Sequence, residues 1–102
     1  MANKQDYIEA LRVAILNLHN SDALWRYTVP VHEKFKGQTV WNGEVEVFDL
    51  VAHPKAKRAF AWAKLEGQND ETTKFVTVLE LPPVTDARTA VQASIMADSK
   101  KK

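Results

Sequence analysis

A run of cations and aromatic rings in the middle of the chain is the stretch with the clearest chemical meaning. Residues 51–62 read VAHPKAKRAFAW, so an apolar segment passes through His-Pro into basic and then aromatic residues. Cations hold nucleic-acid phosphates, and ring faces stack on unpaired bases. The stretch is therefore a candidate nucleic-acid surface. Its cations are Lys55, Lys57, Arg58 and Lys64, and its rings are Phe60 and Trp62.

The same cations also suit an ordinary hairpin with a solvated turn. The chain carries 14 basic and 13 acidic residues, so its formal net charge is only +1. A protein that binds nucleic acid mainly through phosphate contacts usually shows a stronger basic excess. This balance favours the solvated turn over the nucleic-acid surface.

Two carboxylates and three histidines are the remaining groups that could do chemistry. Glu44 and Glu46 lie on one face of a predicted strand, about 7 Å apart by the strand rise, where a cross-strand row of ion pairs is commoner than acid–base catalysis. His19, His32 and His53 show no metal-ligand spacing, and the chain has no cysteine. We expect no catalytic residue, no metal site and no cofactor.

The pattern of apolar residues predicts a helix at each end of the chain. Steps of three and four residues indicate an amphipathic helix over residues 4–18, and Asn20 suits the left-handed conformation that ends it. A second helix is predicted over residues 86–97, with Thr85 as its N-cap and Asp86 in its first turn.

Between the helices, the pattern changes to that of strands. Three segments are rich in Val, Phe, Trp and Thr and are separated by turn residues; they span 39–51, 57–65 and 74–81. Residues 28–32 are predicted as a further strand at a sheet edge, where Pro30 is tolerated. Asn42-Gly43 is a hairpin signal that equally allows a bulge. The prediction is a two-layer α+β fold: an antiparallel meander of three strands, or four with residues 28–32, and both helices on one face.

The middle strand has two unlike faces. Ala59, Ala61 and Ala63 alternate with Phe60 and Trp62. We expect the thin alanine face to meet both helices, which leaves the two rings on the second face. Because the neighbouring strands are apolar on both sides, something must cover that face: the 20–38 segment, a second copy of the chain, or a ligand.

The predicted order α-β-β-β-α is similar to that of double-stranded-RNA-binding domains. The similarity is one of element order. That family places a basic cluster at the start of its second helix, whereas the corresponding residues here are Thr85-Asp86-Ala87-Arg88, with one base and one acid. The resemblance therefore gives almost no support for duplex RNA binding.

Composition bounds the class of protein. Hydrophobic residues make up 45% of the 102 residues and charged residues 26%, as in ordinary globular domains. We expect one domain over residues 1–98 and a disordered basic tail over 99–102. The absence of cysteine, of an apolar leader and of a spanning segment favours the cytoplasm and predicts no membrane partner.

The leading expectation for function is a small non-enzymatic interaction or oligomerisation module. Its partner is a second copy, as a homodimer, or another protein. The apolar-aromatic sheet face would supply the interface, through Phe60, Trp62, Trp41 and Phe48. The alternative is a nucleic-acid-binding domain that uses the 55–64 hairpin.

Overall fold

The chain folds as a four-stranded sheet between two helices. The computed structural model describes residues 4–66 and 72–99. In chain order the elements are α1 (Lys4–His19), β1 (Asp22–Phe35), β2 (Gln38–Val51), β3 (Arg58–Glu66), β4 (Thr72–Leu79) and α2 (Ala87–Ser99). Of the predicted tail 99–102, Ser99 ends α2 and the other residues lie outside the described ones, as does most of the predicted turn 66–71.

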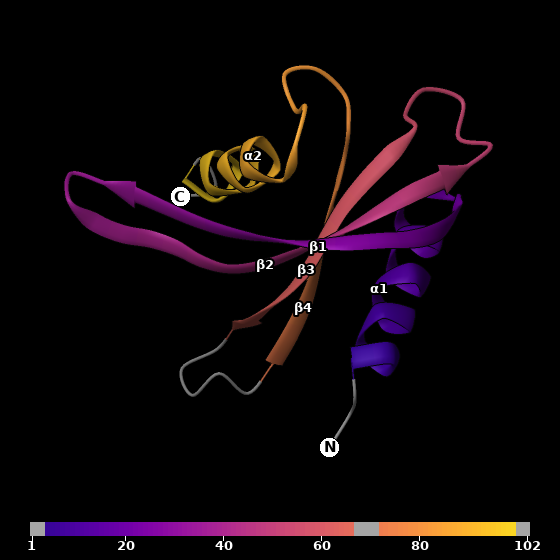
Figure 1. The fold of residues 1–102 in the computed structure, drawn as a ribbon, viewed down its shortest axis with the longest axis horizontal. Coiled ribbons are helices and arrows are strands. Elements are labelled where there is room, and N and C mark those ends of the chain that lie inside the picture. The colour runs from indigo at the N-terminus through magenta and orange to yellow at the C-terminus, as the bar shows by residue number, and fades with distance from the viewer. Residues whose placement is uncertain (1–3, 67–71, 100–102) are drawn as a thin grey trace.

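The sheet is an antiparallel meander with the order β1-β2-β3-β4, which confirms the predicted fold class. β1 and β2 form a long hairpin. Its outer part, residues 29–45, is here called the arm and extends beyond the other strands (Figure 1). β2 pairs with β3 over four residues only, Glu46–Asp49 with Arg58–Ala61. No helix in the described residues is long and apolar enough to cross a membrane.

β1 is much longer than the predicted segment 28–32. Pro30 lies in it as expected, because β1 is an edge strand and need not donate every backbone hydrogen bond. The hairpin turn falls at Lys36-Gly37, where both residues have positive φ, as a tight two-residue turn requires. Asn42-Gly43 instead lies inside β2, and the ring of Trp41 covers Gly43 so closely that a Cβ would approach it to 3.1 Å.

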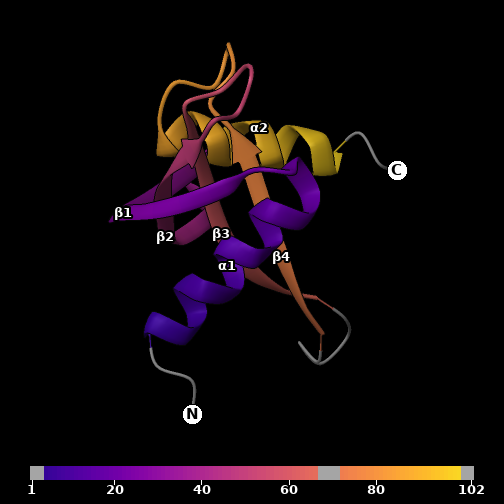
Figure 2. The same cartoon turned by 90° about the vertical axis from the view of Figure 1, so that its right-hand side faces the viewer.

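The predicted placement of both helices on one face is wrong. α1 packs on the alanine face, where Leu11 and Ile15 contact Phe48 and both alanines, Ala59 and Ala61. α2 packs on the opposite face, over Phe60 and Trp62. Figure 2 shows the two helices on either side of the strands. Each face pairs large side chains with small ones, since the alanines meet Leu and Ile while the rings meet the alanines of α2.

Asp86 caps the N-terminus of α2, one residue later than predicted. Its Oδ1 accepts a hydrogen bond from the backbone N–H of Thr89 at 2.9 Å. The Thr89 hydroxyl in turn accepts the backbone N–H groups of Thr85 and Asp86. The cap therefore rests on the Asp86 and Thr89 side chains, and the Thr85 side chain takes no part in these bonds.

We predict that Asp86→Ala lowers the free energy of unfolding by about 1 kcal/mol, because it removes the acceptor for an otherwise unpaired helix N–H. Urea unfolding followed by circular dichroism measures this. Thr85→Ala is the matched control and leaves the midpoint almost unchanged. Equal losses from both substitutions would contradict the assignment of Asp86 as the cap.

Candidate functional site

The aromatic residues predicted as an interface lie mostly inside the core. Phe60 and Trp62 are each 2% exposed and Phe48 is fully buried. Trp41 is half-buried, and its ring meets that of Trp62 edge to face, with centroids 5.6 Å apart. The prediction that the 20–38 segment, a second copy or a ligand covers this face is wrong, because α2 covers it. These three buried rings are not available to a partner.

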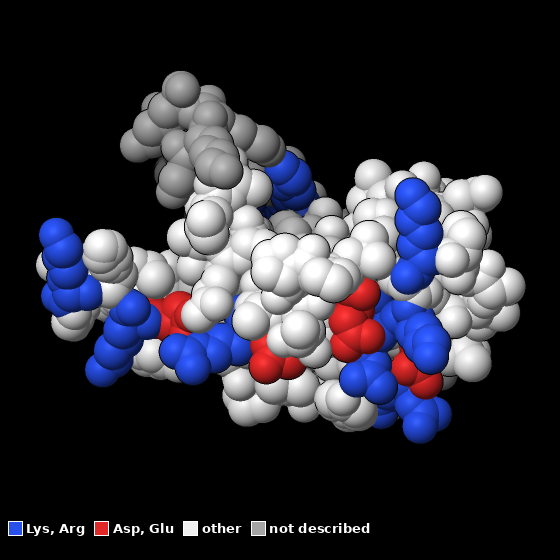
Figure 3. Space-filling view, turned by 90° about the horizontal axis from the view of Figure 1, so that it is seen from above, with Lys and Arg blue, Asp and Glu red and all other residues white. Residues whose placement is uncertain are grey.

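The four predicted phosphate-binding cations do not form one surface. Lys55 and Lys57 are exposed in the loop between β2 and β3, and Arg58 begins β3. Lys64 lies six residues further along β3, roughly 20 Å away by the strand rise. Arg58 and Arg26 both face Asp49, at 3.6 and 3.2 Å. In Figure 3 basic side chains are interspersed with acidic ones. Nucleic-acid binding stays a prediction, and the four cations named for it do not form one continuous patch.

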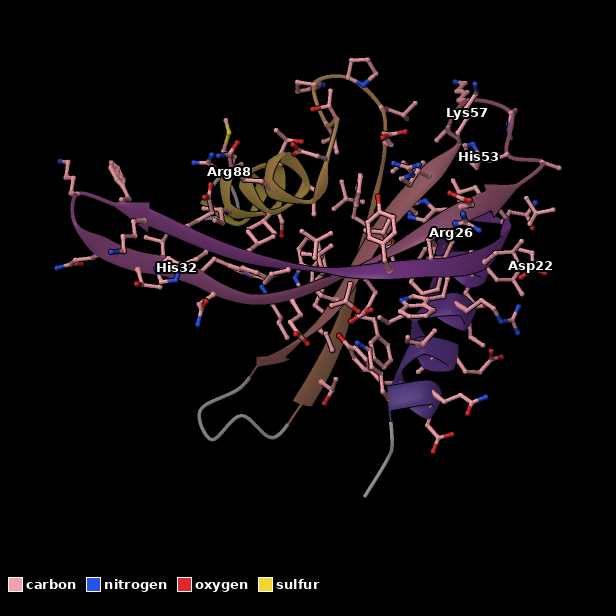
Figure 4. The ribbon with its side chains drawn as sticks, viewed as in Figure 1. Asp22, Arg26, His32, His53, Lys57 and Arg88 are labelled. Atoms are coloured by element: carbon pink, nitrogen blue, oxygen red, sulfur yellow. The ribbon has the colours of Figure 1, made fainter. Side chains whose placement is uncertain are left out.

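The three histidines each contact neighbouring groups of the fold. His53 Nδ1 accepts the backbone N–H groups of Lys55 and Ala56, at 3.1 and 2.9 Å, so this ring shapes the loop. Figure 4 shows His32 on the arm, far from His53. His19 contacts Thr77 on β4, with Nε2 2.6 Å from the hydroxyl oxygen. Among the described residues no three His, Asp or Glu side chains gather as metal ligands.

The two carboxylates predicted to share a face have different environments. Glu44 is exposed, whereas Glu46 is 1% exposed. Oε1 of Glu46 accepts hydrogen bonds from Trp25 Nε1 at 2.9 Å and from the Thr28 hydroxyl at 2.6 Å. A bulge at Arg26 shifts the register between Trp25 and Tyr27, so both donors lie on the same face of β1. Glu46 thus ties the bulge to β2.

A groove along β4 is the strongest candidate site. It has a volume of about 490 Å³ and lies between the end of α1, the strands β3 and β4, and the second half of α2. We call it the β4 groove. Its lining is Leu18, His19, Lys64, Lys74, Phe75, Val76, Thr77, Val78, Ala93, Ser94 and Ala97. Figure 2 shows β4 passing between the two helices at this side of the molecule.

The edge of β4 is unpaired within the described part of the chain, since β4 pairs with β3 alone. Glu80 N–H donates to the carbonyl oxygen of Arg58 at 2.9 Å, which fixes the alternation of hydrogen bonding along the strand. The backbone groups of Lys74, Val76 and Val78 therefore point toward β3. Those of Phe75, Thr77 and Leu79 point toward the free edge.

β4 also has apolar side chains on both faces. Val76 and Val78 pack toward α2, and Phe75 and Leu79 pack toward α1. All four are half-buried, in contrast to the fully buried residues of β3 next to them. An edge strand that is apolar on both sides and lacks a neighbour is the kind of edge to which another strand adds.

Two unpartnered charges mark the ends of this edge. Lys74 is exposed and Glu80 half-buried, and neither side chain has an ion-pair or hydrogen-bond partner among the described residues. Lys74 also lies directly opposite Lys64 on β3. A carboxylate placed opposite Lys74 on an added strand would be favourable.

A second cavity of similar volume lies where α2 begins, between the arm and the start of β3. Its charged groups are already engaged. Arg88 Nε donates to Glu33 at 3.0 Å, Arg58 faces Asp49, and Asp86 caps α2. We therefore place the candidate site at the β4 groove.

The sequence reasoning missed Lys74, Thr77 and Glu80, although a signal for them existed. The last strand of a meander must be an edge strand, and residues 75–79 (FVTVL) are apolar on both faces. Comparison of the chain with protein-family models, with curated proteins and with solved structures found no match.

We predict that Glu46→Ala lowers the free energy of unfolding by about 2 kcal/mol, because Trp25 and Thr28 lose the acceptor they share. Thermal unfolding measures this. Glu44→Ala, an exposed carboxylate two residues earlier on the same strand face, should change the stability by less than about 0.5 kcal/mol. Similar effects of the two substitutions would contradict a structural role for Glu46.

His19 should make the stability depend on pH. Burial, and to a smaller extent His53, lowers the pKa of His19 in the folded protein. Below about pH 6.5 the unfolded state therefore binds more protons than the folded state. The free energy of unfolding then falls as the pH drops toward the pKa of His19 in the folded protein. His19→Gln removes this contribution, so the wild-type urea midpoint should drop more than the variant's between about pH 7.5 and 5.5. Equal decreases in the urea midpoint of the two proteins would exclude this contribution of His19.

Proposed function

We propose that the chain is a non-enzymatic protein-interaction module that binds an extended polypeptide segment by strand addition along β4. The observation that carries the proposal is the free β4 edge at the base of a groove between two helices. The outward backbone groups of Phe75, Thr77 and Leu79 would bond an added strand, and main-chain bonds of this kind supply affinity in strand addition.

The walls of the groove support an extended occupant. A strand in the plane of the sheet projects alternate side chains toward the two helices. On the α2 side these would meet small residues, Ala93, Ser94 and Ala97, and on the α1 side the exposed Leu18. The groove therefore suits a segment with apolar residues on both faces, and the exposed Lys74 at one end favours an acidic residue.

The state of the buried carboxylates supports a binding function rather than catalysis. Glu46 and Glu33 each accept two side-chain hydrogen bonds, Glu33 from Gln92 at 2.6 Å and from Arg88. The bond from Gln92, and then those to Arg88, lower the pKa of Glu33. A general base needs a pKa near the working pH and a free lone pair aimed at substrate, and these groups are committed to the fold.

A synthetic peptide of residues 72–80 tests the proposal, because it carries an apolar strand with opposite charges at its ends. We predict that it binds, and that the amide NMR signals of Phe75, Thr77 and Leu79 shift more than those of Val76 and Val78. Those three amides should also exchange more slowly with deuterium in the complex, because the added strand accepts their N–H groups.

Thr77→Pro should abolish peptide binding, because it removes an outward N–H without breaking a β3 bond. Thr77→Val is the matched control: it loses the hydroxyl that contacts His19 but keeps the N–H, and so should still bind. Absence of peptide binding to a wild-type chain that is monomeric, or shifts confined to other strands, would overturn strand addition at β4.

A further inference from the structure

We propose that the strand added at β4 belongs to a second copy of this chain, paired antiparallel about a two-fold axis at Thr77. The inference rests on the proposed strand addition and specifies its partner and register. In this register Thr77 faces Thr77 of the second copy, and the two sheets join into one. The interface is isologous, since each copy offers the same strand.

The backbone geometry permits this register. In an antiparallel ladder, residues that exchange both hydrogen bonds must both point their backbone groups at each other. Thr77 points outward, so two copies can exchange N–H···O=C bonds across the axis. Phe75 and Leu79 also point outward, and each would pair with the other in the second copy. The Leu79 carbonyl already accepts the N–H of Leu81 and has a second lone pair for this contact.

The charges select the same register. Lys74 and Glu80 lie three residues before and three after Thr77, so Lys74 would face Glu80 of the second copy twice over. Both are unpartnered among the described residues. They fall at positions between the hydrogen-bonded pairs, where opposing side chains approach most closely.

The apolar side chains match in this register as well. Val76 would face Val78 of the second copy on the α2 side, and Phe75 would face Leu79 on the α1 side. Aromatic–aliphatic and β-branched pairs stabilise neighbouring strands. A register centred one residue away on Val76 would instead place Lys74 opposite Val78 and leave Glu80 without a basic partner.

Charge reversal of the two end residues tests the register. Sedimentation velocity over a concentration series should show that the wild-type chain dimerises. Lys74→Glu and Glu80→Lys should each weaken the dimer about tenfold or more, because each puts like charges opposite one another at both ends. An equimolar mixture of the two single variants should form a heterodimer tighter than either homodimer, and the double variant K74E/E80K should recover wild-type association.

Lys55→Glu is the matched control for Lys74→Glu, since it changes the net charge by the same amount from an exposed loop position outside β4, and it should leave dimerisation unchanged. A wild-type chain that stays monomeric while it binds the 72–80 peptide would overturn this inference and leave strand addition standing. A dimer insensitive to both reversals would overturn the register. Failure of peptide binding together with a monomeric chain would overturn both proposals.

Discussion

The fold depends on burying two rings, Phe60 and Trp62, on the sheet face that α1 does not cover. α2 does this with small side chains, Ala87 and Ala90, which let the helix lie close to the rings. The arm curves around α2, and Glu33 on the arm binds Arg88 and Gln92 of that helix. β4 lies at the margin of the sheet, and no strand among the described residues pairs with its outer edge.

Local sequence patterns predicted the helices and strands well, but they did not predict how these elements pack against one another. The helix periodicity located both helices, and Asn20 has the expected positive φ. β1 was underestimated because its exposed apolar residues and the Arg26 bulge break the alternation of side chains. The prediction that both helices cover one face of the sheet was wrong because the alanines of β3 and those of α2 look complementary in the sequence. In the structure, small surfaces pack against large ones instead.

The candidate site was less predictable than the fold. The 55–64 stretch drew attention through residue types, yet His53 is used within its own loop and Phe60 and Trp62 lie in the core. The β4 groove is formed where α1 and α2 flank the edge of β4. The spacing of residues along the chain does not encode this arrangement. Only the two-sided apolar character of residues 75–79 pointed to it, and that pattern is equally typical of a strand buried inside a sheet.

The short seam between β2 and β3 has a mechanical consequence. Four residue pairs, and a backbone hydrogen bond from Leu50 N–H to the Lys57 carbonyl, join the β1–β2 hairpin to the β3–β4 hairpin, whereas β1 and β2 are paired along nearly their whole length. Each hairpin thus has more paired residues between its own two strands than with the other hairpin. The seam residues are nonetheless among the most buried of the sheet, whereas the outer end of the β1–β2 hairpin is exposed and has no third strand beside it in the described residues. Thermal fluctuations should therefore open the outer end of that hairpin before they part the seam.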